Sequence, residues 1–313
     1  MKKYPTVPCA ALLLVICFLG GLVSLPLQAR DYSMFDKVSG AELVIVGRVV
    51  KYKTKAEIEV LEVLKGEWSE KTLEIRFRTA NYERKKIGIE AIQFYEDERL
   101  LLFLQARDDK ARSKGRFILY PEDMRGRLEL HDDEEARLIL EAVNTCVGAS
   151  FKDREELREV WRQMARERNV YLRLCGLESL EYDRALDVDA LPLLAALYND
   201  RYPVIRRRAL QLTSVVVRFR PGSFRDTPER EILMYEVLPL LEDEHEVVRL
   251  EAVSTLQHLG DQRVLPTLRR ISQSDPAQEV RLEATRVIFQ EESGWLVDSE
   301  PTPAPAESQT PER

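Results

Sequence analysis

The 313-residue sequence contains few of the side chains on which most enzyme active sites depend. Histidine occurs only as His131, His245 and His258, and there are four cysteines. No Gly-x-Ser-x-Gly nucleophile turn, Gly-rich phosphate loop, His-Glu-x-x-His zinc motif or Cys-x-x-Cys pair is present. His131 and His245 stand among acids where helices are expected to begin, and acids favour helix N-termini. We therefore predict a protein without catalytic residues, metal or cofactor.

Basic residues are also fewer than acidic residues. The chain has 47 Lys and Arg against 54 Asp and Glu, which gives a formal net charge of −7. Loss of Lys2 and Lys3 with an N-terminal leader would take this charge from −7 to −9. Such an acidic chain argues against nucleic acid as the ligand.

The longest hydrophobic run lies at the N-terminus. Residues 1–29 place Lys2 and Lys3 before an apolar stretch that ends near Pro26 and Ala29, which is the layout of a secretory signal peptide. We expect cleavage after Ala29 and export to the periplasm or the extracellular space. The competing interpretation is an uncleaved membrane anchor, because the stretch approaches the roughly 20 residues that span a bilayer.

Residues 38–130 contain short runs with strand patterning. "TLEIRFR" at 72–78 alternates apolar and charged residues, and "RLLLFLQ" at 99–105 is continuously apolar, as expected of a central strand. Five or six such strands close most easily into a small barrel. The runs "AELVIVGRVV", "IEVLEVLKGE" and "ERLLLFL" resemble the OB-like, netrin-type barrel of bacterial exported proteins. A related barrel occurs in tissue inhibitors of metalloproteinases, but they chelate metal with an N-terminal cysteine, whereas this mature chain would begin "RDYSMFD".

The C-terminal half repeats itself. "EVVRLEAV" at 246–253 returns as "QEVRLEAT" at 278–285. Aligning the arginines of such phrases gives three columns: an arginine, an acid six residues before it and a small residue three residues after it. The arginines are Arg173, Arg206, Arg249 and Arg281; the acids are Glu167, Asp200, Asp243 and Asp275; the small residues are Gly176, Ala209, Ala252 and Ala284.

Each repeat is expected to form two helices, because no single unit can bury its apolar face and stacking gives a fixed period. The acid should cap the second helix, the small residue should allow close packing, and arginines and acids of neighbouring units should form a ladder. This pattern resembles the HEAT repeat family. The resemblance implies an α-α superhelical, armadillo-like solenoid over residues 150–291, with about four helix pairs.

The predicted fold class is therefore α+β with two domains, a small β-barrel followed by a HEAT-like solenoid. Residues 131–149 are expected to form a connecting helix that caps the solenoid, and the Pro-rich residues 299–313 a disordered tail. Cys146 ends the connecting helix and Cys175 opens a repeat helix, so a disulfide between them would lock the two together. Two separate buried thiols are the alternative.

Function in a solenoid is expected on the face lined by the second helices, at positions two, five, six and nine after each ladder arginine. Residues 201–230 also carry eight arginines against two acids, a local balance of +6. This cluster suits an acidic or phosphorylated envelope ligand. The predicted binding residues are Arg206, Arg207, Arg208, Gln211, Arg218, Arg220, Arg225, Glu251, Thr255, His258, Glu283 and Arg286.

The sequence thus favours an exported, non-enzymatic scaffold of the bacterial envelope that binds a partner protein. One alternative is an envelope enzyme or regulatory subunit with Tyr182, Glu251 and His258 converging in the groove. The other alternative is a protease inhibitor that acts through the barrel.

Overall fold

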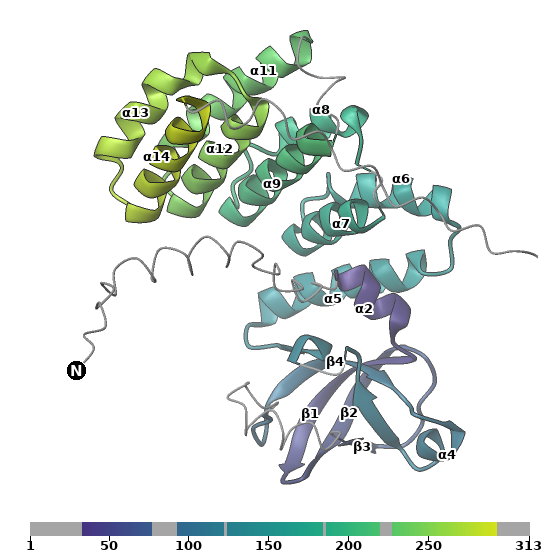
Figure 1. Ribbon diagram of the computed structural model, residues 1–313. Coiled ribbons are helices and arrows are strands. Elements are labelled where there is room, and N and C mark those ends of the chain that lie inside the picture. The colour runs from purple at the N-terminus through teal and green to yellow at the C-terminus, as the bar shows by residue number, and fades with distance from the viewer. Residues whose placement is uncertain (1–32, 77–92, 122–123, 184–185, 220–226, 293–313) are drawn as a thin grey trace, which may run out of the picture.

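The computed structural model describes residues 33–76, 93–121, 124–183, 186–219 and 227–292. A closed five-stranded β-barrel is followed by a stack of helices, which confirms the predicted α+β fold of two domains (Figure 1). Within the described ranges, no helix is both long and apolar enough to cross a bilayer.

The barrel closes through a fixed strand order. Neighbouring strands follow the order β1-β2-β3-β5-β4, and β4 pairs again with β1. β3 and β5 are parallel, and the other pairs are antiparallel. A short strand, β6, extends the sheet beside β4. The bounds are β1 Leu43–Tyr52, β2 Lys55–Lys65, β3 Thr72–Arg76, β4 Arg99–Gln105, β5 Arg116–Leu119 and β6 Arg127–Glu129.

Strand β4 is buried on both faces, which explains its continuous apolar run. Leu100, Leu102 and Leu104 face the barrel interior, whereas Leu101 and Phe103 join the core that runs into the helices. The helix covering this outer side is α5, Asp133–Ala149, which begins at the N-cap Asp132.

A helix that the sequence analysis did not predict, α2 (Met34–Gly40), packs against α5 and the first repeat. Ser33 and Asp36 form a capping box at its start. The ring of Phe35 meets the edge of Trp161 at 5.4 Å between centroids. Residues 38–40, which were assigned to the barrel, belong to this helix, and one core therefore continues from the barrel's outer face into the repeats.

The repeats form two layers of helices (Figure 1). The second helices α7, α9, α12 and α14 lie side by side, each packed against the first helix or helices of its own unit. The bounds are α6 Arg154–Met164, α7 Val170–Tyr182, η2 Val188–Ala190, α8 Leu191–Ala196, α9 Pro203–Phe219, α11 Pro228–Val237, η3 Leu238–Glu242, α12 Glu246–Leu259, η4 Gln262–Val264, α13 Leu265–Ser274 and α14 Gln278–Glu292.

The column of small residues lies where the two helices of a unit pack closely together. A Cβ on Gly176 would stand 2.4 Å from the backbone oxygen of Trp161, closer than any real contact. Ala209, Ala252 and Ala284 occupy the same column in the other units and are completely buried. These positions fix the spacing of the paired helices.

Candidate interaction surface of the solenoid

The arginine column connects successive units. Each arginine donates through Nη1 to the backbone oxygen of the acid six residues before it. The rest of the guanidinium reaches the carboxylate of the next unit's acid, which joins Arg173 to Asp200, Arg206 to Asp243 and Arg249 to Asp275. We call these contacts the ladder.

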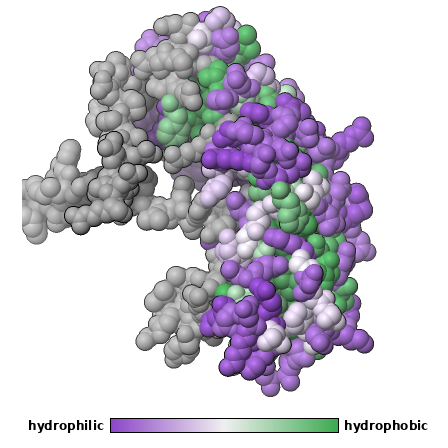
Figure 2. Space-filling model, turned by 90° about the vertical axis from the view of Figure 1, so that its right-hand side faces the viewer, coloured by the Kyte–Doolittle hydropathy of each residue, from purple (hydrophilic) through white to green (hydrophobic). Residues whose placement is uncertain are grey.

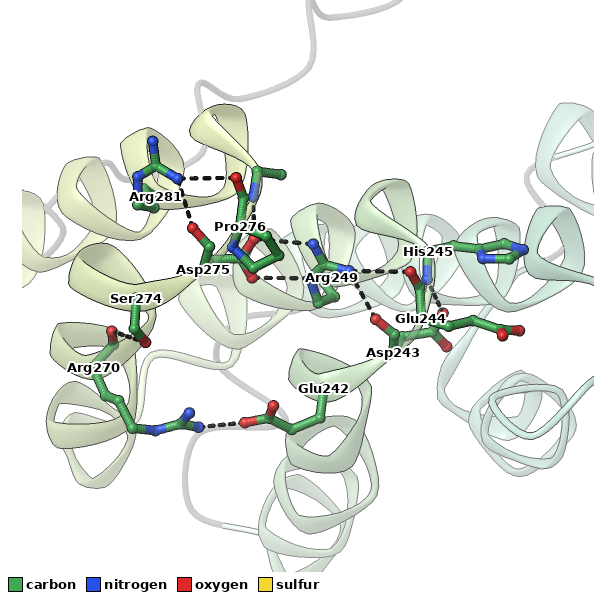
Figure 3. A network of polar contacts seen from close by, with 11 residues as sticks. Glu242, Asp243, Glu244, His245, Arg249, Arg270, Ser274, Asp275, Pro276 and Arg281 are labelled. Atoms are coloured by element: carbon green, nitrogen blue, oxygen red, sulfur yellow. Dashed lines mark hydrogen bonds and ion pairs between the residues drawn. The ribbon is translucent and has the colours of Figure 1, made fainter.

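The contact between Arg249 and Asp275 is bidentate and buried (Figure 3). Nε and Nη2 of Arg249 lie 2.9 Å and 3.0 Å from the two carboxylate oxygens. The same carboxylate accepts the backbone N–H of Ala277 at 2.8 Å, so it also caps the turn into α14. Asp243 repeats this arrangement with Arg206 and the N–H of His245.

The ladder sets the protonation of its carboxyl groups. Burial alone would raise the pKa of Asp275, but hydrogen bonds from Arg249 and the Ala277 N–H outweigh it and hold the pKa below its usual value. Burial acts on Asp243 in the same direction, and Arg206 and the His245 N–H again lower the pKa. Both groups are therefore carboxylates at neutral pH.

The ladder is open at its C-terminal end within the described residues. Arg281 donates to the backbone oxygens of Asp275 and Pro276 at 2.6 Å and 3.1 Å, and the structure gives it no carboxylate there. Beside it, Leu282 and Phe289 are exposed on α14.

A second set of polar residues crosses the same helices on their outer side, and we call it the polar strip. Arg208 on α9 donates to Glu181 on α7 at 2.5 Å. Gln211 on α9 donates to Glu251 on α12 at 3.0 Å. On α14, Arg286 binds Glu283 and reaches back to Gln257 of α12 at 2.6 Å. The members of the polar strip are Glu181, Arg207, Arg208, Gln211, Arg218, Glu251, Gln257, His258, Glu283, Arg286 and Gln290.

Glu251 and His258 of the strip have shifted pKa values. Burial raises the pKa of Glu251, although Gln211 and the nearby arginines oppose the shift. Burial also lowers the pKa of His258, and the positive charges of Arg218 and Arg286 lower it further. His258 is therefore mainly neutral at pH 7, because its ordinary pKa already lies near 6.5.

The structure corrects two of the predicted binding residues. Thr255 is completely buried, its hydroxyl donates to the backbone oxygen of Glu251 at 2.8 Å with that of Leu210 at 3.2 Å beside it, and it accepts from Ser214. At about 100° per residue, positions two, five and nine after the ladder arginine point within about 40° of one outward direction, whereas position six points about 60° aside. That flank packs against the preceding second helix. Arg206 is also buried, because it belongs to the ladder.

The arginines of residues 201–230 do not form a free cationic patch in the part of the chain that is described. Arg207 lies 4.0 Å from Glu251, Arg208 pairs with Glu181, and Arg206 pairs with Asp243. Arg230 donates to the backbone oxygens of Leu259 and Gly260. The predicted residues Arg220 and Arg225 lie outside the described residues. Acids from neighbouring units therefore pair with three of the six described arginines of this segment.

Of the residues considered for catalysis, Glu251 and His258 belong to the polar strip, whereas Tyr182 does not. Glu251 and His258 are seven residues apart on α12, which places them about 10 Å apart along the helix axis. Tyr182 ends α7, two second helices away, and is half exposed. Among the described residues, no group of three His, Cys, Asp or Glu side chains is arranged to hold a metal ion.

The two cysteines lie together in the junction between α5 and α7. Both are buried and free, and their Sγ atoms are 3.3 Å apart. The contact with Cys175, followed by burial, raises the pKa of the Cys146 thiol well above its ordinary value.

Comparison with known families covers the end of the solenoid. Residues 231–288 match the HEAT repeats family. These two units resemble HEAT repeats. The matched span contains Arg249 and Arg281. The units around Arg173 and Arg206 lie outside the matched span but have the same ladder geometry. HEAT repeats are typically non-catalytic and suggest an interaction scaffold. No curated protein and no solved structure matches the chain.

Proposed function

We propose that the protein is an exported, non-enzymatic scaffold that binds a partner protein along the polar strip of its HEAT-like solenoid. The observation that carries this proposal is the continuity of the strip across four successive second helices. A row of aligned polar groups on stacked helices is the surface that solenoids offer to extended ligands.

The charge pattern favours a polypeptide over a polyanion. Along the strip, the acids Glu181, Glu251 and Glu283 are interspersed with the arginines Arg207, Arg208, Arg218 and Arg286. A polyanion would meet three carboxylates, whereas a polypeptide can present charges of both signs together with amide groups. Figure 2 shows the molecule from the right-hand side of Figure 1, and that face is mainly hydrophilic, with hydrophobic residues in separate patches.

Site-specific photo-crosslinking in intact cells tests the proposal. A photoreactive residue replaces Gln211 of the strip in one variant and the exposed Gln273 of α13 in the matched control. We expect one protein adduct at position 211 and its absence at position 273. Equal labelling at both positions, or no adduct at 211, would contradict binding through the strip.

A charge-reversal pair then tests the contribution of the strip's arginines. R207E/R286E reverses two strip arginines and should abolish the adduct, because a partner that complements the strip would meet two repulsive charges. R269E/R270E makes the same change on α13, where each arginine also has one exposed ion pair, and should leave the adduct unchanged. Thermal melts of both variants check that each remains folded.

Export is the second part of the proposal, and the sequence of residues 1–29 supports it. The intact mass of the protein recovered from cells should equal that of a chain beginning at Arg30. Recovery of the uncleaved chain from the membrane fraction would instead favour the anchor.

A further inference from the structure

A pocket on the outer side of the barrel is lined by five basic residues. It lies between β3, β5 and the β4–β5 connection that carries the short helix α4, Asp109–Arg112. Its volume is about 200 Å³, and Phe117 and Ile118 contribute apolar lining. The basic residues are Arg76, Arg107, Lys110, Lys114 and Arg116.

The strand register brings two of these cations together. β3 and β5 run parallel, and Glu74 of β3 stands opposite Arg116 of β5. Side chains alternate along a strand, so Glu74 and Arg76 share the outward face. Glu74 contacts Arg76 directly and lies 3.9 Å from Arg116, which partly neutralises these two arginines.

The other three cations have no such compensation among the described residues. Arg107, Lys110 and Lys114 are exposed, and no acid there forms an ion pair with them. The one carboxylate in the lining, Asp108, accepts the N–H of Ala111 at 2.6 Å and caps α4. Five positive charges thus face two carboxylates, on a protein whose net charge is −7. Like charges gathered in this way repel one another, and a bound anion would relieve the repulsion.

We propose that this pocket binds the phosphate groups of a small polyanion. Arginine guanidinium groups match phosphate oxygens in a bidentate manner, and lysines add point charges. A phosphate monoester carries a charge of about −1.5 to −2 at neutral pH, so two phosphate groups would balance the excess. The apolar side chains beside the cations would contact the organic part of the ligand. This site lies on the barrel and is independent of the partner surface proposed for the solenoid.

Isothermal titration of the full-length chain with pyrophosphate, at constant ionic strength set by chloride, tests the proposal. K110E/K114E reverses two exposed cations of the pocket and should weaken binding about tenfold or more, as expected for loss of charge-assisted contacts. K51E/K53E makes the same charge change at exposed positions on β1 and the following turn, outside the pocket, and should bind as the native chain does. Thermal melts without ligand check the folding of both variants.

Two results would overturn the proposal: no binding of pyrophosphate by the native chain, or equal weakening in both double variants. Equal weakening would mean that the overall charge of the barrel attracts the anion and that the pocket does not. If pyrophosphate binds in the pocket, sedimentation with phosphatidylcholine vesicles, with and without phosphatidic acid, assigns the source. Sedimentation that needs phosphatidic acid and is lost in K110E/K114E assigns a lipid headgroup, and its absence assigns a soluble phosphate compound.

Discussion

Replacing Arg249 with alanine should lower the free energy of unfolding of the C-terminal repeats by about 3–5 kcal/mol. The side chain is 9% exposed and that of its partner Asp275 is 2% exposed. Without the guanidinium, the carboxylate stays buried with the N–H of Ala277 as a remaining donor. The backbone oxygens of Asp243 and Glu244 lose a donor as well. An uncompensated buried charge is the largest part of the expected loss.

The matched control is Arg281→Ala, the same substitution in the same column of the last unit. Arg281 donates to two backbone oxygens but reaches no carboxylate among the described residues. Its loss should therefore cost about 1 kcal/mol. The difference between the two variants, about 2–4 kcal/mol, measures the buried ion pair itself.

Hydrogen exchange read by mass spectrometry is the appropriate assay, because stacked repeats can open locally. In Arg249→Ala, protection should fall in α13 and α14 and stay unchanged in α6 and α7. Urea unfolding of both variants gives the corresponding free energies. Equal losses in the two variants would refute the reasoning, because the units would then be held by apolar packing alone.

The same variant should alter the response to acid. The native pKa of Asp275 lies below its usual value, so the stability gained from ionisation is fully present above the unfolded pKa of about 3.9. It is lost as the pH falls through the native pKa. The stability gap between the native chain and Arg249→Ala should therefore be widest near pH 7 and narrow below about pH 4. A gap that stays constant down to acid unfolding would contradict this account.

Two further predictions concern helix contacts. Gly176→Ala should destabilise the protein by about 1–3 kcal/mol, because the new Cβ would clash with the backbone oxygen of Trp161. The control is Gly148→Ala, where no atom lies within 4 Å of the new Cβ. That substitution should stabilise the protein by up to about 1 kcal/mol. Thermal melts of both variants measure these changes in stability, and stabilisation by Gly176→Ala would contradict the close packing at this position. Cys146 and Cys175 should form a disulfide in protein that has passed through an oxidising compartment, which would lower the intact mass by about 2 Da relative to reduced protein. An unchanged mass would contradict that expectation.

Much of the solenoid could be predicted from spacing alone. The columns of arginine, acid and small residue come from a stack whose units repeat the same contacts, so the period of the sequence carries the geometry. Spacing could not show that each arginine uses its own unit's acid only through the backbone oxygen. The carboxylates of Asp200, Asp243 and Asp275 bind the arginine of the preceding unit, as the predicted ladder between neighbouring units requires.

The outward-facing positions were harder to predict. Position six after each ladder arginine points only about 60° away from the outward direction of the helix. Whether a residue there is exposed therefore depends on packing by the neighbouring helix. Thr255 is buried for that reason, whereas Glu251 at position two remains partly accessible. Similarly, the net charge of residues 201–230 does not include the acids that pair with Arg207 and Arg208, because those acids come from adjacent units.

Helix α2 carries a local signal in the sequence. Ser33 and Asp36 have capping-box spacing, and Phe35 and Val38 lie three residues apart on one apolar face. The basic pocket of the barrel had a partial local signal, because four of its five cations lie within residues 107–116. The fifth cation, Arg76, joins them only through the parallel pairing of β3 with β5, which spacing along the chain does not show.

The continuous core through α2 and α5 has a consequence for binding at both ends of the molecule. With side chains of both helices packed into the same core as β1 and β4, the junction offers no flexible linker about which the barrel could swivel. A ligand that contacts both domains would therefore not have to fix their relative orientation, and binding would not lose the conformational entropy of a flexible junction. Its avidity would depend on whether its own two contact points match one fixed separation, as with a rigid spacer between binding modules.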